Sequence, residues 1–163
     1  LELEGLVTMV PRKGARVAQI TQKNLKDVLE VRVALDALAV QLACERMTDE
    51  DIRKLEEACA EFERATATKD STKIAQADVA LHDCIVKASG NDRLVQLVNN
   101  LSEQMYRYRL EYIKDDNYHG LLVEEHQMIL DGLKSRDKEK AVAAVTLHIH
   151  NQEKTIMKQL HLE

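Results

Sequence analysis

Four side chains that can bind a metal ion lie within apolar stretches of this chain: Asp78, His82, His126 and His148. Asp78 and His82 are four residues apart, so on a helix they share one face. His126 and His148 each interrupt another apolar stripe with helical spacing. Because buried polar groups without partners are costly, these inward faces predict one shared partner, a divalent metal inside a helical bundle. The alternative is a buried group that hydrogen-bonds only within itself.

The composition of the chain favours long helices packed into one domain. Its 163 residues include one proline and five glycines, 45% are hydrophobic and 31% are charged. This length is enough for a sizeable core, and residues that suit helices dominate. The net charge of −5 makes most of the chain a poor partner for nucleic acid or an anionic membrane. No apolar run approaches the roughly 18 residues that would span a bilayer, so we expect no membrane partner.

The three cysteines, Cys44, Cys59 and Cys84, lie inside the expected helices and form no CxxC pair. An odd number of separated cysteines is typical of reduced thiols and not of a disulfide framework. Since no signal peptide is visible either, we expect a cytoplasmic protein.

The first twenty residues differ from the rest of the chain. Two short apolar segments, residues 3–7 and 15–20, flank a turn that contains Pro11 and Gly14, which predicts a β-hairpin. The hairpin carries a small basic group, made of Arg12, Lys13 and Arg16. Because a two-stranded hairpin alone is barely stable, we expect residues 1–20 to be the end of another domain, which the helical domain follows.

From about residue 22 to residue 160 the pattern is helical. Caps, turn residues and apolar spacing predict about six helices separated by short connections. A first helix, capped by Thr21 or Asn24, precedes the acidic cap cluster at Thr48. The others cover about residues 49–67, 71–89, 92–114, 121–134 and 138–159. Short links between amphipathic helices imply antiparallel neighbours, so we expect an all-α antiparallel bundle.

The order of several short motifs resembles a known family. The motifs are Glu30-Val31-Arg32, Asp78-x-x-x-His82, Ala88-Ser89-Gly90-Asn91, Glu125-His126, Arg136-Asp137 and His148-Ile149. In this order they resemble the C-terminal effector-binding (FCD) domain of the GntR superfamily of bacterial transcription regulators, FadR subfamily, over about residues 22–160. The wing of that family's winged helix-turn-helix domain is similar to the opening residues Gly5-Leu6-Val7, Pro11-Arg12-Lys13-Gly14 and Val17. The resemblance implies a regulator whose DNA-binding domain precedes the helices.

The resemblance also implies a version of the domain that binds a metal. Members of this type use one aspartate and three histidines, which here would be Asp78, His82, His126 and His148. Imidazole and carboxylate suit zinc, nickel, iron or manganese, with zinc or nickel favoured, and a set without cysteine argues against a closed structural zinc site. Members that bind fatty acyl-CoA lack the full set, so its presence favours a small carboxylate effector on or beside the metal.

A carboxylate effector also needs a fixed donor, for which a buried arginine is the usual residue. Arg32 lies beside the apolar stripe of the first helix, and Arg109 lies between Met105 and Tyr112 on the fourth. We expect both arginines to bind the effector. For Arg32 the alternative is a structural ion pair with Asp36, four residues further on.

A ligand-sensing transcription regulator is the function that these features favour. Metal and carboxylate would bind inside the bundle and bias the attached DNA-binding domains, within a homodimer as is usual for helix-turn-helix proteins. One alternative is a metalloenzyme, although Glu125 and Asp83, the nearest spare bases, are expected to point away from the cluster. Another is a dimerisation module with a structural metal. Three further histidines fit neither the spacing nor the faces and are expected to be solvated: His119, His150 and His161.

Overall fold

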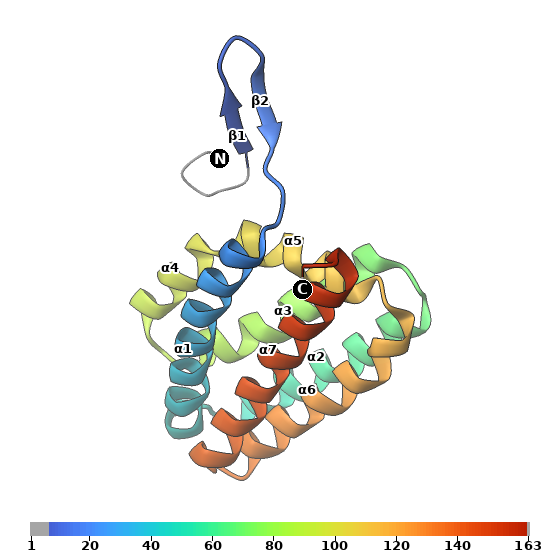
Figure 1. Ribbon diagram of the computed structural model, residues 1–163. Coiled ribbons are helices and arrows are strands. Elements are labelled where there is room, and N and C mark those ends of the chain that lie inside the picture. Colours follow the sequence, from blue (N-terminus) through green and yellow to red (C-terminus); the bar gives the residue numbers. More distant parts are fainter. Residues whose placement is uncertain (1–6, 163) are drawn as a thin grey trace.

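The computed structural model describes residues 7–162, and most of them are helical (Figure 1). The elements are, in order, β1 (Val7–Val10), β2 (Gly14–Val17), α1 (Gln22–Arg46), α2 (Asp49–Ala67), α3 (Ser71–Ala88), α4 (Asp92–Asn100), α5 (Ser102–Ile113), the 3-10 turn η1 (Asp116–Tyr118), α6 (His119–Lys134) and α7 (Lys138–Leu160). The prediction of an all-α bundle behind a short β-hairpin is confirmed. α7 packs along both α1 and α6, and α3 packs against α2 and α1.

Over the described residues the bundle has seven α-helices where about six were expected, because the segment predicted as one helix over 92–114 is two. Between α4 and α5, Leu101 makes a tight turn in which its N–H donates to the carbonyl of Val98 at 3.0 Å. Asn100 ends α4 and Ser102 begins α5. Asn and Ser side chains compete with the helical backbone for hydrogen bonds, so they favour helix ends. Apolar residues at helical spacing on both sides conceal this break in the sequence.

Side-chain caps fix where most of the helices begin. Of the two candidates at α1, Thr21 is the cap, since its Oγ1 accepts the N–H of Asn24 at 3.2 Å. Thr48 and Asp51 form a reciprocal capping box at α2. Side chains also cap α3, α4 and α7, namely Asp70, Asn91 and Asp137. Each such cap contributes about 1 kcal/mol, so the helix starts are encoded locally.

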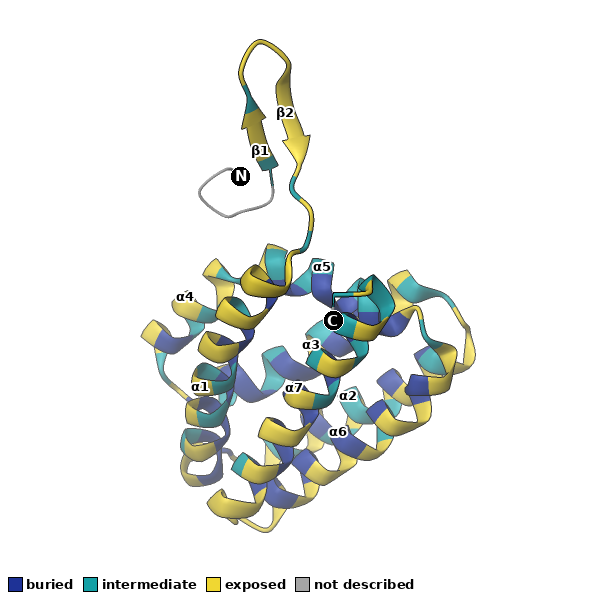
Figure 2. Cartoon of the chain, viewed as in Figure 1, coloured by how far each residue is buried: buried dark blue, intermediate teal, exposed yellow. Residues whose placement is uncertain are grey.

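The hairpin projects from the bundle at the start of α1 (Figure 1). Its strands are antiparallel, and the register runs from Val7 opposite Val17 to Val10 opposite Gly14. The expected first strand at residues 3–7 lies outside the described residues except for Val7, which pairs with Val17. β2 ends at Val17, short of the predicted end at residue 20. All of β2 is exposed (Figure 2), so the hairpin offers a free surface.

Aliphatic and aromatic side chains fill the centre of the bundle, and Tyr108 and Tyr112 belong to this core. Cys44, Cys59 and Cys84 are free thiols. Burial raises the pKa of the Cys59 thiol to about 12, so it stays protonated. In the part of the chain that the structure describes, none of the helices combines the length and apolar character needed to cross a membrane.

Gly132 lets α6 and α7 approach each other closely. A Cβ atom there would lie 2.8 Å from the backbone N and Cα of Ala141 in α7. Gly132→Ala should therefore lower the free energy of unfolding by about 1–3 kcal/mol, because the two packed helices must shift. The control is Gly120→Ala, whose Cβ would meet no atom within 4 Å and which should be neutral or slightly stabilising. Urea denaturation measures both, and equal losses would contradict the prediction.

Candidate metal centre

Asp78, His82, His126 and His148 meet in the middle of the bundle. The first two come from α3, His126 comes from α6 and His148 from α7. Each of the four residues is at most 8% exposed. One ligand atom from each lies within 4.8 Å of those from the other three. Three apolar helix faces therefore bring their polar residues to a single point.

The spacing of these side chains fits a small cation. His126 Nε2 lies 3.2 Å from Asp78 Oδ1, and His148 Nε2 lies 3.2 Å from His82 Nε2. The distance between His82 Nε2 and Asp78 Oδ1 is 3.8 Å. With bonds of about 2.0–2.1 Å, the ligand atoms of tetrahedral zinc are about 3.3 Å apart. Two separations match this value, and the wider ones leave space for a further ligand.

Several atoms of the cluster are buried without a hydrogen-bond partner, namely Asp78 Oδ1 and both ring nitrogens of His126. The contact between His126 Nε2 and Asp78 Oδ1 has the distance of an ion pair but lacks hydrogen-bond geometry. Leaving a buried donor or acceptor unsatisfied costs about 1–3 kcal/mol. A cation could take a lone pair from Asp78 Oδ1 and one from His126 Nε2, which faces it, so the donor set fits a metal.

The second oxygen of Asp78 is held by α5. Both Arg109 Nε and the Tyr112 hydroxyl donate to Asp78 Oδ2, the hydroxyl at 2.9 Å. Burial by itself would raise the pKa of Asp78, but the positive charge of Arg109 holds that pKa well below its usual range. The carboxylate is therefore ionised, with Oδ2 fixed from one side and Oδ1 left for the histidines.

Two histidines of the cluster, His82 and His148, are kept neutral. Burial lowers the pKa values of His82 and His148 well below their usual range, although Asp78 acts in the opposite direction. His148 Nδ1 lies 2.7 Å from Glu125 Oε2. An Nδ1–H donated to this carboxylate leaves Nε2 with its lone pair toward the cluster. A neutral imidazole oriented in this way is the form that binds a metal.

Glu125 lies against the cluster, which corrects the expectation that it points away. It is 2% exposed, and its Oε1 accepts a hydrogen bond from Asn151 Nδ2 at 2.6 Å. Burial raises the pKa of Glu125 to about 7, although the hydrogen bond from Asn151 acts in the opposite direction. Glu125 lies three residues after the buried Leu122 and one before His126, so it shares the inner face of α6. Glu125 supports His148 and is not a spare base.

The other histidines lie outside the cluster. His119 was expected to be solvated, but it is buried where α6 begins. Its Nε2 lies 2.7 Å from the carbonyl oxygen of Ile113, because η1 folds the chain back over the end of α5. As expected, the two remaining histidines are exposed: His150 and His161.

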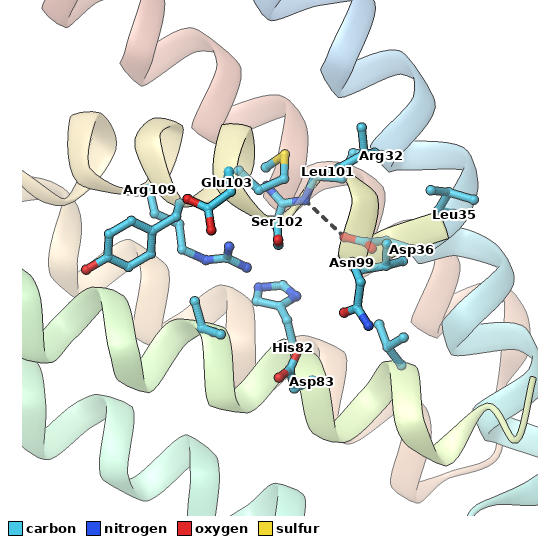
Figure 3. A pocket seen from close by; sticks show the side chains of 15 residues that line it. Arg32, Leu35, Asp36, His82, Asp83, Asn99, Leu101, Ser102, Glu103 and Arg109 are labelled. Atoms are coloured by element: carbon cyan, nitrogen blue, oxygen red, sulfur yellow. Dashed lines mark hydrogen bonds and ion pairs between the residues drawn. The ribbon is translucent and has the colours of Figure 1, made fainter. Parts of the chain in front are cut away.

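A cavity of about 390 Å³ lies beside the cluster, bordered by α1, α3, α4 and α5 (Figure 3). His82 lines it from α3, so one residue of the cluster is accessible from the cavity. The two predicted effector residues, Arg32 and Arg109, line the same cavity from α1 and α5. Its volume lies within the range of about 300–1,000 Å³ that is typical of small-molecule sites. A small metabolite therefore fits beside His82.

Both arginines have partners at the cavity wall. Arg32 Nε donates to Asp36 at 3.2 Å, which is the ion pair considered as the alternative role, and Nη1 donates to Gln152 Oε1 at 2.6 Å. Arg32 Nη2 has no partner. Arg109 Nε donates a hydrogen bond to Asp78, and the end of the Arg109 side chain points toward His82 (Figure 3). Arg32 thus combines the structural pair with one unused donor.

Comparison with known proteins decides the family. The model of the FCD domain matches residues 27–151, most of the helical region. This chain belongs to the FCD-domain family of GntR-type transcription regulators.

Curated relatives of this FCD-domain chain regulate transcription. It is 27% identical over 153 residues to the HTH-type transcriptional regulator YdhC of Bacillus subtilis, covering 93% of this chain and 68% of that one. It is 30% identical over 149 residues to the Nta operon transcriptional regulator of Aminobacter aminovorans, covering 91% and 69%. The chain thus spans about two thirds of the length of these relatives.

Solved structures share the fold of the FCD-domain chain. McbR/YncC of E. coli superposes with a TM-score of 0.87 at 19% identity, covering 98% of this chain and 80% of that one. The metal-free FCD domain of TM0439 gives 0.74 at 18% identity, covering 90% and 100%. The curated relatives are named as transcription regulators and the solved structures share the fold, so the predicted family and fold are confirmed and a regulator is favoured over the metalloenzyme alternative.

Proposed function

We propose that this FCD domain binds one divalent metal through Asp78, His82, His126 and His148. The buried lone pairs without partners and the separations of 3.2 Å support this assignment. Imidazole-rich sites bind nickel and zinc more tightly than manganese or iron, so we favour the first two. A bound metal would supply positive charge and an open position for an oxygen ligand.

A small carboxylate is the effector class that the cavity favours. The observation that carries this proposal is that the cavity presents His82 together with Arg32 and Arg109. An arginine beside a cation attracts a carboxylate through charge and hydrogen bonds. Apolar ligands without an acceptor would leave the buried arginine N–H groups unsatisfied and are therefore disfavoured. Apolar side chains also line the cavity, among them Val79 and Met105, which suits a ligand with a short hydrocarbon body.

The proposed output is control of DNA binding by a domain to which residues 1–20 belong. α1 begins at Gln22, directly after the hairpin, and its residue Arg32 lines the effector cavity. A ligand that prefers one arrangement of α1 would therefore bias the attached domain. We propose that the regulator acts as a homodimer on operator DNA, since dimeric helix-turn-helix proteins bind two half-sites.

Calorimetric titration tests this function with a panel of small mono-, di- and hydroxycarboxylates. We expect at least one to bind the zinc-loaded chain, and to bind the chelator-treated chain or the His82→Ala variant at least tenfold more weakly. A carboxylate that binds equally well without zinc would contradict the proposal. Tight zinc binding with no carboxylate bound would favour the dimerisation module instead.

The basic residues of the hairpin give a separate prediction for the full-length regulator. Replacing Arg12, Lys13 and Arg16 with alanine should weaken binding to DNA of any sequence, because these exposed side chains would contact phosphates. The slope of log K against log salt is negative, and its magnitude should decrease by up to about three units. Fluorescence anisotropy at several salt concentrations measures the slope, with Lys23→Ala as the control. An unchanged slope would argue against a wing that contacts DNA.

A further inference from the structure

Gln152 connects the metal cluster to the effector cavity by two contacts. It lies one turn after His148 on α7 and is fully buried. Its Nε2 is 2.8 Å from His148 Nε2, and its Oε1 accepts a hydrogen bond from Arg32 Nη1 at 2.6 Å. Arg32 lines the cavity. One side chain therefore spans the distance from a proposed metal ligand to the cavity wall.

The chemistry of its neighbours fixes the orientation of the Gln152 amide. An arginine only donates hydrogen bonds, so the amide atom that faces Arg32 is the oxygen. The atom that faces His148 is then the amide nitrogen, which donates to Nε2. His148 Nε2 is free to accept, since Nδ1 is held by Glu125. Gln152, at 2.8 Å, is thus the nearer of two groups that face the lone pair a metal on His148 would need, and His82 Nε2 at 3.2 Å is the other.

We propose that Gln152 is a positioning residue that couples metal occupancy to Arg32, an inference that rests on the metal site proposed above. A neutral imidazole has one lone pair on Nε2, so a metal and the Gln152 N–H compete for it. A divalent cation also repels the positive end of the N–H dipole. Because the amide group is planar and rigid, displacing its nitrogen from His148 also displaces its oxygen from Arg32.

Release from Gln152 would give Arg32 a second donor for the cavity. Nη2 already has no partner, and Nη1 would join it while Nε keeps Asp36. Two adjacent N–H groups form the fork that binds a carboxylate in a bidentate manner. Arg32 belongs to α1, which packs along α7 and follows the hairpin (Figure 1). The metal would then increase the affinity for the carboxylate. By linkage, the carboxylate would increase the affinity for the metal by the same factor.

A double-mutant cycle on zinc affinity tests the coupling. Gln152→Met keeps the volume of the side chain and removes both polar atoms, and Arg32→Met removes the other end of the connection. Competition with a chromophoric chelator gives the Kd for Zn²⁺ in the wild type, both variants and the double variant. We expect Gln152→Met to bind Zn²⁺ about two- to tenfold more tightly, since no N–H competes for His148. Arg32→Met should tighten Zn²⁺ binding more in the wild-type background than in the Gln152→Met background, because Arg32 is proposed to act through Gln152.

The outcomes separate the coupling from the metal site. Weaker Zn²⁺ binding by Gln152→Met would overturn the coupling and leave the site intact. So would a double variant whose fold-change in Kd equals the product of the two single fold-changes, because the substitutions would then act independently. A wild-type chain that binds no Zn²⁺ would overturn both. Gln159→Met, on the same helix and partly exposed, is the control for the substitution itself and should leave the Kd unchanged.

A second measurement follows Arg32 directly by NMR. In the wild type, Zn²⁺ should speed the exchange of the Arg32 side-chain N–H protons with water, because the bond to Gln152 is lost. In Gln152→Met this exchange should already be fast and should not respond to Zn²⁺. Exchange in the wild type that Zn²⁺ leaves unchanged would overturn the coupling, whatever the affinities are.

Discussion

Asp78→Ala should destabilise the metal-free domain by about 3–5 kcal/mol, the largest loss that we expect from any substitution in the cluster. The reason is Arg109, which is 7% exposed and donates its Nε to Asp78. Removing the carboxylate leaves a buried guanidinium without its counter-charge, and the Tyr112 hydroxyl also loses its acceptor. The loss arises without any metal, so it separates the structural role of Asp78 from its role as a ligand.

Urea denaturation of the chelator-treated chains at neutral pH measures this loss. Because the folded-state pKa of Asp78 is depressed, its contribution is present above about pH 4 and is lost as the pH falls through the lower folded-state value. Asp83→Ala is the matched control on the same helix. Asp83 is half-exposed, and its ion pair with the exposed Lys87 is long, at 3.9 Å. Asp83→Ala should therefore change the free energy of unfolding by no more than about 0.5 kcal/mol. Equal losses in the two variants would refute the pairing of Asp78 with Arg109.

Zinc should raise the thermal midpoint of the chain by about 8–16 °C, and His126→Ala should abolish this rise. At a free concentration about a thousand times its Kd, a ligand of the folded state adds about 4 kcal/mol of stability. In a domain of this size each kcal/mol moves the midpoint by about 2–4 °C. His126 Nε2 faces Asp78 Oδ1 and neither atom has a hydrogen-bond partner, so removal of this imidazole takes away a ligand that no other contact engages.

Differential scanning fluorimetry with and without Zn²⁺ measures the rise. His150→Ala is the control, since His150 is exposed and lies two residues after His148 on the same helix. It should keep the full response to zinc. A response of the same size in His126→Ala would place the zinc elsewhere on the chain.

The residues of the cluster were predictable from the sequence because each stands on an apolar helix face. Asp78 and His82 share the face that also carries Leu81 and Ile85, and these neighbours are buried. Likewise, His148 lies on the stripe that contains Val145 and Ile149. Helical periodicity therefore shows which side chains turn inward. The cost of burying these groups without partners predicts that the three faces meet, and the family resemblance supports the same expectation.

What surrounds the cluster was not predictable in the same way. Glu125 was expected to point away from the cluster, but it follows the buried Leu122 by three residues and shares the inner face of α6. Gln152 lies four residues after His148, but an amide on an apolar face gives no sign of a metal or a ligand by itself. Its contact with Arg32 joins residues 120 positions apart in the sequence. Such contacts depend on how the helices pack, which periodicity along one helix does not contain.

The break between α4 and α5 shows the same limit. The residues Asn99, Asn100 and Ser102 favour helix ends, but a continuous apolar face across Leu101 outweighed them in the prediction. The break matters for the site because Leu101 and Ser102 line the cavity beside Arg109.

Elemental analysis of the purified chain after exposure to zinc or nickel and dialysis is the most direct test of the metal site. We expect about one metal ion per chain in the wild type, and loss of that ion in both His82→Ala and His126→Ala. A wild-type chain that retains no metal would rule out the proposed site. The four residues would then form a polar network inside the bundle, and the cavity beside them would have to select its ligand through Arg32 and Arg109 alone.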